Sequence, residues 1–576
     1  MKKSLFFLSL LGAIAFSSCS SDDGMGGGEL PGSKETKYLS VNLVAAPGMD
    51  KAYPEEAENY EDGTEAENNV NSVRFYFFDS EGNAAAVKKL GEGYVNYYDW
   101  TPTKTGAPDA PNVEKTLNAT IVIESPADGS KDRIPEQVVA VLNPTADVEA
   151  KSYSLDELNK VIKDFSATTA TIGEEAKSSF VMSNTVYANN NKALVEAVSV
   201  KNNLYNTREA ALANPVTIYV ERVLAKVRLE TAITEGVITL EDGTKLYPTF
   251  TADKDQEFNG EKIYAKFLGW NVTATANTSR LMKKINPDWA DDLFNGSEPW
   301  NFYPYFRSFW AINPESMTYG YGSFNESKDG SVNLANAIKG FSSTGTEKNY
   351  TYVQENAAVD NNGADPTTPT KVIVAAQLVD KDGEPIEMAE WSFNRYTING
   401  LKDVLLSSSN LYKKTVSGTE TTFTPMTRDD IVFKTATVTG DASSSVSGRY
   451  YVYAQLSDAA ASETWVTGSD KNAPTVNAND VLKALGHAKI WKSGYTYYYF
   501  DIKHLNKTEN GYGKLGVVRN HLYNANIKTL VGLGTPIYDP KEVIYPEMPK
   551  EEDTYIAAEI KIVSWRLVPQ DVDFNW

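Results

Sequence analysis

Short runs of alternating apolar and polar residues, separated by turn-forming residues, are the dominant pattern along this 576-residue chain. In the run 38–44, Leu39, Val41 and Leu43 fall on one face, which is typical of a half-buried β-strand. Asp242-Gly243 and Asp382-Gly383 are typical of the hairpin turns that join such runs. Further alternating or wholly apolar runs predict strands at 73–78, 120–123, 138–144, 216–229, 372–379, 449–456 and 495–502.

One helix is predicted after Ser154, because Ser154 and Glu157 have the spacing of a capping box. The apolar residues that continue this helix at helical spacing are Leu158, Val161, Ile162 and Phe165. Many strands with few helices predict an all-β fold built from two antiparallel β-sandwich domains. We expect these domains at 52–230 and 231–534, followed by a Pro-rich linker and tail at 535–576.

The first residues have the features of a secretory signal. Lys2 and Lys3 precede an apolar run over 5–16, which is too short to span a bilayer as a helix. The run ends in Phe16-Ser17-Ser18-Cys19, which resembles the bacterial lipobox with Phe16 in place of the usual Leu. We expect a signal peptide at 1–19 and lipid attachment at Cys19. The alternative is an ordinary signal in which the cysteine is incidental.

Composition narrows the function classes. The net charge is −21, and residues 1–51 hold five basic and five acidic residues, so the later residues carry the whole excess. An acidic surface argues against nucleic-acid binding, which needs Lys and Arg patches. Cys19 is the only cysteine, which excludes an intrachain disulfide framework and a cysteine-based zinc site. Residues 20–37 are rich in Ser, Gly and Asp and are typical of a flexible tether.

Enzymatic chemistry finds little support in the sequence. The chain has three histidines, and none lies in a nucleophile turn or a metal-binding His motif. Asp380-Lys381-Asp382-Gly383 begins like a calcium loop but lacks the ligands that follow, so a hairpin turn is the better interpretation. We therefore predict a protein that is not an enzyme and needs no metal or cofactor.

Several sequence blocks, taken in order, resemble the Bacteroidales fimbrillins (type V pilins). The resemblance is greatest to the major shaft subunit of the short (minor) fimbriae. The blocks are 219–227 with Glu221, Arg222, Ala225 and Lys226, 267–273 with Gly269 and Trp270, 309–314, 519–527 continuing to Gly532 and Gly534, and the ending 555–576. The family implies transthyretin-like sandwiches, export as an outer-membrane lipoprotein precursor, and a place in a cell-surface fimbrium that supports adhesion and biofilm formation.

Each block also has a purely structural interpretation. Trp270 and Trp310 suit a core better than a ligand platform. Arg519 and Asn520 could form a catalytic pair, but at the start of a strand they are expected to satisfy backbone groups.

The resemblance implies proteolytic processing after an Arg or Lys, which maps here onto Lys51 and Ala52, by a trypsin-like protease. The segment 47–51 is polar and turn-rich, and 52–69 is acidic and poor in apolar residues, so this loop should be exposed. The removed segment, 20–51, would then contain the tether and the first strand. Arg74 lies inside a predicted strand and should be protected.

The tail is predicted to be a donor strand that enters an identical neighbouring subunit, with accessory anchor and tip proteins as further partners. Ile556, Ala558, Ile560 and Ile562 share one face, and Val572, Phe574 and Trp576 alternate at the end. Such pairing is β-strand addition, and a head-to-tail contact that does not close gives an open filament. The alternative is that 554–576 forms the last strand of its own domain.

Two other functions share much of this pattern. A surface glycan-binding lipoprotein of a nutrient-uptake system would have the same lipobox, acidity and β-sandwiches, but would need neither cleavage nor a donor tail. A fimbrial anchor or tip subunit is the other alternative.

Overall fold

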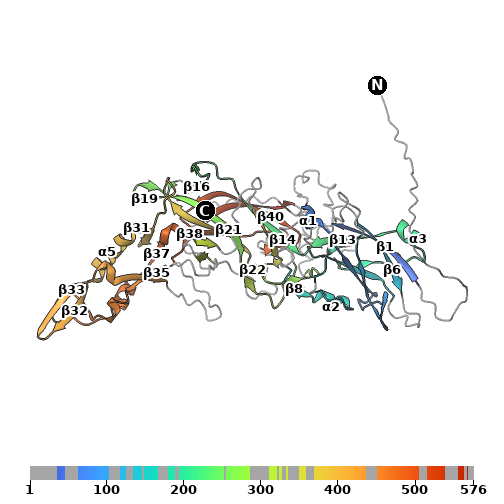
Figure 1. Ribbon diagram of the computed structural model, residues 1–576, viewed down its shortest axis with the longest axis horizontal. Helices are drawn as coiled ribbons and strands as arrows, with labels where there is room; N and C mark the ends of the chain where they lie inside the picture. The colour runs from blue at the N-terminus through green and yellow to red at the C-terminus, as the bar shows by residue number, and fades with distance from the viewer. Residues whose placement is uncertain are drawn as a thin grey trace, which may run out of the picture.

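The computed structural model is an elongated, mostly β molecule (Figure 1). The strands of the N-terminal region lie at one end, and the hairpin β32–β33 (Leu411–Ser417 and Glu420–Pro425) lies at the other. The described residues are 36–45, 63–102, 117–124, 134–145, 148–165, 180–188, 194–251, 254–285, 311–320, 324–326, 332–334, 349–357, 369–435, 451–504, 516–538, 555–563 and 567–568.

An eight-stranded sheet forms the N-terminal region, in the order β5-β2-β7-β9-β13-β1-β6, with β12 pairing β7. The pairings are antiparallel except that between β1 and β13, which is parallel. Its inward side chains form one large hydrophobic core. The strands are β1 (Thr36–Ala45), β2 (Val73–Phe78), β5 (Tyr97–Trp100), β6 (Leu117–Glu124), β7 (Gln137–Leu142), β9 (Met182–Asn184), β12 (Val198–Ser199) and β13 (Val216–Arg222).

Two further sheets pack face to face around a second core, which contains the fully buried Trp270. The predicted role of Trp270 as a core residue is confirmed, whereas Trp310 lies outside the described residues. One sheet contains β14 (Leu224–Thr231), β17 (Phe250–Thr251), β18 (Lys254–Asp255), β27 (Tyr350–Gln354), β40 (Leu522–Val531), β42 (Tyr555–Val563) and β43 (Leu567–Val568). The other contains β15 (Ile238–Thr239), β16 (Lys245–Pro248), β21 (Tyr264–Thr273), β29 (Lys371–Val379), β38 (Tyr495–Asp501) and β41 (Thr535–Pro536).

The chain changes sheets at Val223. The run 216–229 was predicted as one strand, but β13 belongs to the first sheet and β14 to the second. Val223 is fully buried and joins the first core, and its N–H donates to the carbonyl of Val181. The sheets therefore separate seven residues before the expected boundary at 230, and that boundary stays a prediction.

A third hydrophobic core lies within residues 388–491, which we call the distal module. Met388 and Trp491 are cross-strand partners, so the module leaves and re-enters the second sandwich at one point. It contains a five-stranded sheet, a three-stranded sheet and two helices, and it lies within the expected second domain, 231–534. Its elements are β30 (Met388–Trp391), β31 (Asn394–Tyr396), α5 (Ile398–Ser409), β32, β33, η5 (Arg428–Asp430), β34 (Ile431–Thr435), β35 (Tyr451–Leu456), η6 (Ala460–Ser462), β36 (Trp465–Thr467), α6 (Ala478–Ala484) and β37 (His487–Trp491).

The predicted helix after Ser154 is shorter than expected. Its capping box forms, but α2 covers only Leu155–Asn159. Ile162 instead lies in β8 (Ile162–Lys163), which pairs with β23 (Ser279–Arg280), so tertiary pairing replaces the continued helix. The other helices of the N-terminal region are α1 (Glu65–Asn68) and α3 (Arg208–Ala213). In the part of the chain that the structure describes, no helix has the length and apolarity needed to cross a membrane.

Short two-stranded ribbons and one 3-10 turn complete the description. The turns at Asp242-Gly243 and Asp382-Gly383 form as predicted, with glycine φ angles of 85° and 88°. The ribbons are β3 (Lys88–Leu90) with β4 (Gly93–Val95), β10 (Tyr187–Ala188) with β11 (Leu194–Val195), β19 (Glu257–Phe258) with β20 (Glu261–Lys262), β22 (Thr275–Ala276) with β24 (Tyr319–Gly320), β25 (Phe324–Glu326) with β26 (Val332–Leu334) and β28 (Asn356–Ala357) with β39 (Gly516–Val517); the turn is η7 (Lys492–Gly494).

Candidate functional site

The first strand, β1, is paired along both of its edges. It runs antiparallel to β6 over Thr36–Leu43 and parallel to β13 over Val41–Ala45. Where β13 does not reach, Tyr38 and Tyr205 exchange two backbone hydrogen bonds of 2.7 and 3.0 Å. The strand therefore lies inside the sheet and closes the gap between β13 and β6.

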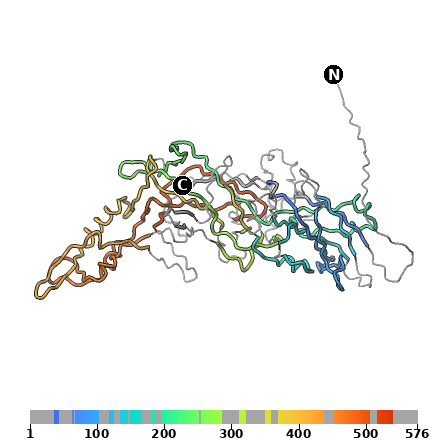
Figure 2. The backbone as a smooth tube through the Cα atoms, viewed as in Figure 1, coloured from blue at the N-terminus to red at the C-terminus, as the bar shows by residue number. Residues whose placement is uncertain are grey.

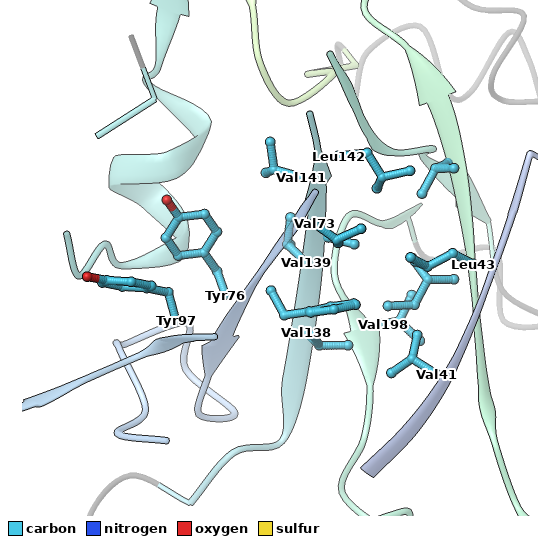
Figure 3. Packing of buried hydrophobic residues seen from close by; sticks show 14 of the residues in the cluster. Val41, Leu43, Val73, Tyr76, Tyr97, Val138, Val139, Val141, Leu142 and Val198 are labelled. Atoms are coloured by element: carbon cyan, nitrogen blue, oxygen red, sulfur yellow. The ribbon is translucent and has the colours of Figure 1, made fainter. Parts of the chain in front are cut away.

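The side chains of β1 contribute directly to the core. Leu39, Val41 and Leu43 are fully buried, as their alternation predicts, and Figure 3 shows Val41 and Leu43 pointing into the same cluster as Val138 and Val198. Full burial of such a side chain stabilises a fold by about 1.5–3 kcal/mol. The three together therefore contribute about 5–9 kcal/mol.

The helix α3 lies against the strands β1 and β6. Ser40 is also buried, and Lys37 Nζ donates to Asn206 Oδ1 at 2.6 Å. Parts of both faces of β1 are thus covered. Cys19, Lys51 and Ala52, the predicted lipid and cleavage positions, lie outside the described residues, so these assignments stay predictions.

The described residues continue at Gly63, and the short helix α1 is held at the junction between the first and second sheets (Figure 2). Glu67 of α1 is completely buried and makes an ion pair of 2.9 Å with Lys226 of β14. The hydroxyl of Tyr352 in β27 donates to the same carboxylate. Arg222, at the end of β13, donates through Nε to the carbonyl of Glu67 at 2.9 Å and also to Asn68.

Charge pairing keeps the Glu67 carboxyl ionised in this buried position. Burial alone would raise its pKa, but the ammonium group of Lys226, the hydroxyl of Tyr352 and the guanidinium of Arg222 outweigh burial and lower the pKa. Burial, together with the charge of Glu67, raises the pKa of Tyr352, so this phenol stays a hydrogen-bond donor. The Glu67 carboxylate is therefore held in a buried ionic network.

A second buried group lies on the other side of the junction. Arg519, before β40, pairs with Glu355 at 2.8 Å and donates to the carbonyls of Leu281 and Arg280 at 2.9 and 2.7 Å. The predicted role of Arg519 in satisfying backbone groups agrees with this geometry. Asn520 accepts from Arg222 Nη1 at 3.0 Å, so the two groups are linked.

The carboxyl of Glu221 belongs to the same junction. Its pKa is raised because the side chain is completely buried, even though Lys283 lies 4.0 Å away and Thr185 donates to it at 2.9 Å. Among the described residues, no group of three or more His, Cys, Asp or Glu side chains could hold a metal ion. Five of its members, Glu221, Arg222, Lys226, Arg519 and Asn520, lie in two of the sequence blocks named above, whereas Glu67, Lys283 and Glu355 come from segments that carried no signal.

The tail strand β42 is paired within its own chain. It runs antiparallel to β40, from Tyr555 opposite Val531 to Val563 opposite Leu522, with an irregularity between Ile527 and Thr529. This is the alternative that the sequence left open for the tail. It places four of the predicted donor residues, Ile556, Ala558, Ile560 and Ile562, beside β40, and the other three, Val572, Phe574 and Trp576, lie outside the described residues.

The start of the predicted linker also belongs to the body. Thr535 and Pro536 pair with β38, and Ile537 is buried. Proline is compatible with this position because β41 is a short strand at the edge of its sheet. Any connecting segment therefore begins after Tyr538, whose hydroxyl donates to the carbonyl of Phe433 at 3.0 Å.

Comparison with known proteins agrees with the predicted resemblance. Residues 489–571 match the family described as the C-terminal part of fimbrillin, major fimbrial subunit protein type IV. The matched segment contains β38, β40 and β42, so it covers one edge of the second sandwich and the tail. The predicted resemblance to the Bacteroidales fimbrillins is confirmed. No curated protein matches the chain.

Solved structures that match the chain include the following three proteins, at low identity. A putative cell adhesion protein of Parabacteroides distasonis has 12% identity and a TM-score of 0.39, with 93% of this chain and 99% of that chain covered. The fimbrilin FimA of Porphyromonas gingivalis has 11% identity and a TM-score of 0.37, with 92% and 99% covered. The C-terminally truncated tip fimbrial protein Mfa3 of the same organism has 11% identity and a TM-score of 0.29, with 92% and 100% covered.

Proposed function

We propose that this chain is the shaft subunit of a cell-surface fimbria, made as a lipoprotein precursor and assembled by strand exchange. Lipid at Cys19 would hold the precursor at the outer membrane, and cleavage between Lys51 and Ala52 would release 20–51 together with β1. The tail of a neighbouring copy would then take the place of β1. The observation that carries the proposal is the position of β1, paired on both edges and buried in the core.

Loss of β1 would leave a defect that another strand can repair. The facing edges of β6 and β13 would lose their backbone partners, and such edges pair readily with another chain. The lost burial of about 5–9 kcal/mol is comparable with the whole stability of a typical domain. The opened sandwich is therefore aggregation-prone alone and gains stability from a replacement strand.

The junction would confine the loss of structure after cleavage to β1. After cleavage, the new N-terminal segment would still be tied down through α1, because Glu67 and Asn68 are bonded to Arg222 and Lys226. The remaining strands of the first sheet would keep their places, and the gap would keep the shape of the departed strand.

The tail has the size of the strand that it would replace. β42 has nine residues and β1 has ten. The apolar positions 556, 558, 560 and 562 repeat every second residue, as do the buried positions 39, 41 and 43 of β1. Before donation β42 would have to leave β40, so one set of backbone pairs is exchanged for another. Possession of both a replaceable strand and a tail supports the role of a shaft subunit.

Two measurements test this proposal. The first is the N-terminus of protein extracted from the cell surface: Ala52 supports a fibre subunit, and a lipid-modified Cys19 as the only N-terminus in assembled material contradicts it. The second is the size distribution on denaturing gels of a chain that lacks 555–576. We expect folded monomers without polymer ladders, and ladders from this truncation would refute the donor role of the tail.

A matched pair of tail variants separates insertion from general disturbance. Ile560→Asp changes the apolar face of the tail, and Lys561→Asp changes the opposite face at the next residue. We expect Ile560→Asp to stay monomeric and Lys561→Asp to polymerise. Equal behaviour of the two variants would contradict insertion by alternate side chains.

A further inference from the structure

The turn between β30 and β31 presents a large aromatic residue in an unfavourable backbone conformation. Trp391 and Asn394 are cross-strand partners, so Ser392 and Phe393 form a two-residue hairpin turn. Their φ angles are 49° and 63°, in the left-handed region where Gly and Asn are preferred. The side chain of Phe393 is 96% exposed. Phe393 therefore gains no burial within the subunit that would compensate for this conformation.

The hairpin that carries Phe393 is fixed to its surroundings on both strands. Trp391 Nε1 donates to the carbonyl of Leu485 at 3.1 Å, and Arg395 Nη1 donates to the carbonyl of Glu257 at 2.8 Å. Glu390 lies 3.7 Å from Lys489. A side chain on such a support loses little freedom when it binds, which favours a role in recognition. Backbone strain that the surrounding structure maintains is most often found at functional positions.

Exposed large hydrophobic side chains are found in the N-terminal region and in the distal module. Among the described residues, Leu90, Ile134 and Leu212 belong to the N-terminal region, and Phe393 and Val416 belong to the distal module. The described parts of the sandwich between them have no such residue. Leu212 lies on α3, the helix that lies against β1, at the end opposite to the distal module (Figure 1).

Charge favours contact between unlike ends. The distal module, 388–491, has ten basic and ten acidic residues and is neutral, whereas 52–230 has 17 basic and 28 acidic residues. Two N-terminal ends would repel each other, but a neutral end can approach an acidic one without this cost. An elongated subunit in a head-to-tail polymer brings unlike ends together.

We propose that Phe393 of one copy docks against the N-terminal end of a second copy, on the surface that includes α3 and Leu212. This contact rests on the proposed fibre and adds a second attachment beside the donated strand. It would orient the distal module of one subunit over the slot of the next. The partner is therefore another copy of this chain.

Substitution of Phe393 by glycine separates the strain from the contact. In Phe393→Gly the turn adopts its φ angles without strain, so the isolated subunit should melt at the same temperature as the wild type or higher. Fibre yield, measured by negative-stain microscopy and by ladders on denaturing gels, should fall about tenfold. Phe393→Tyr should keep wild-type yield, and Val416→Thr, at an exposed position of the same module, should leave both quantities unchanged.

The reciprocal variant Leu212→Ser should lower fibre yield in the same direction as Phe393→Gly. Wild-type fibre yield from Phe393→Gly would overturn the inference. The same holds if the variant forms fibres at wild-type yield but no longer adheres to another surface. A lower melting temperature of the Phe393→Gly subunit would also overturn it, because Phe393 would then stabilise its own fold. Absence of polymer from the wild type would instead refute the proposed function.

Discussion

Replacement of Leu39 by alanine should weaken the precursor and leave the fibre unchanged. Leu39 is fully buried in the middle of β1, and its side chain belongs to the first hydrophobic core. A buried Leu→Ala change costs about 2–5 kcal/mol, because the transfer energy is lost and a cavity remains. For a domain of this size, each kcal/mol lowers the melting temperature by about 2–4 °C. The transition of the first sandwich should therefore fall by about 4–20 °C.

The assay is differential scanning calorimetry of two preparations from the same variant. One is the precursor that starts at Ser20, and the other is fibre harvested from cells. Fibres from Leu39→Ala precursor should dissociate at the wild-type temperature, because the proposed cleavage removes the altered strand. Thr36→Ala is the control, since Thr36 is exposed in the same strand and its change should not shift either transition.

Two results would refute this reasoning. If fibres of Leu39→Ala dissociate at a lower temperature by the same amount as the precursor, then β1 remains in the assembled subunit. If neither preparation changes, then β1 does not contribute to the core as the structure describes.

The junction and the distal module give three further predictions. Glu67→Gln should lower the free energy of unfolding by about 3 kcal/mol in denaturant titrations, because Lys226 loses its buried partner, whereas Glu149→Gln in the exposed pair with Lys151 should not change it. The folded state lowers the pKa of Glu67 below its ordinary value of 4.5, so the contribution of Glu67 to stability is complete above that pH and is lost as pH falls through the lowered pKa. The acid side of a plot of stability against pH should therefore be flatter in Glu67→Gln. An unchanged plot would contradict the ion pair. Replacement of 390–489 by Asn-Gly should close a hairpin between Ala389 and Ile490, which are cross-strand partners. Calorimetry should then show that the two sandwiches melt within a few degrees of their melting temperatures in the intact chain. Loss of both transitions would show that the module is part of their fold.

Alternating or wholly apolar runs correctly predicted the strands that have one or both faces buried. The predicted runs at 38–44, 73–78, 372–379 and 495–502 correspond to β1, β2, β29 and β38 with small differences at the ends. The all-β architecture followed from these runs because side-chain period and turn residues are local properties. The hairpin turns were predictable for the same reason.

Long-range pairing explains what the sequence could not show. Helical spacing continued from Leu158 to Phe165, but the pairing of Ile162 with Arg280 ends the helix early. The run 216–229 looked continuous, because Val223 has the same character whether the strand stays in one sheet or passes to another. The helix α5 had local signals in its Thr397 cap and Asn410, which has a φ of 50°, but its place in a separate core depends on the pairing of Met388 with Trp491.

The predicted tail shows the same limit. Its apolar face was readable at 556–562, but alternation alone does not say which strand that face pairs with, and the structure pairs it with β40. Arg222 and Lys226 stood out as part of a sequence block, but their pairing with Glu67 was hidden, because α1 is a distant segment that only the fold brings close to them.

The continuation of β13 into β14, from the first sheet to the second, has a mechanical consequence. β13 lies parallel to β1, and β14, which continues it after Val223, lies parallel to β40. In a fibre under tension, force on a strand seated in the β1 position would pass through β13 and β14 into β40, because each of these strands either pairs with the next or continues into it. Hydrogen bonds in such a shear arrangement are loaded together rather than broken one after another, so the subunit would transmit a pull along its length without opening at the junction.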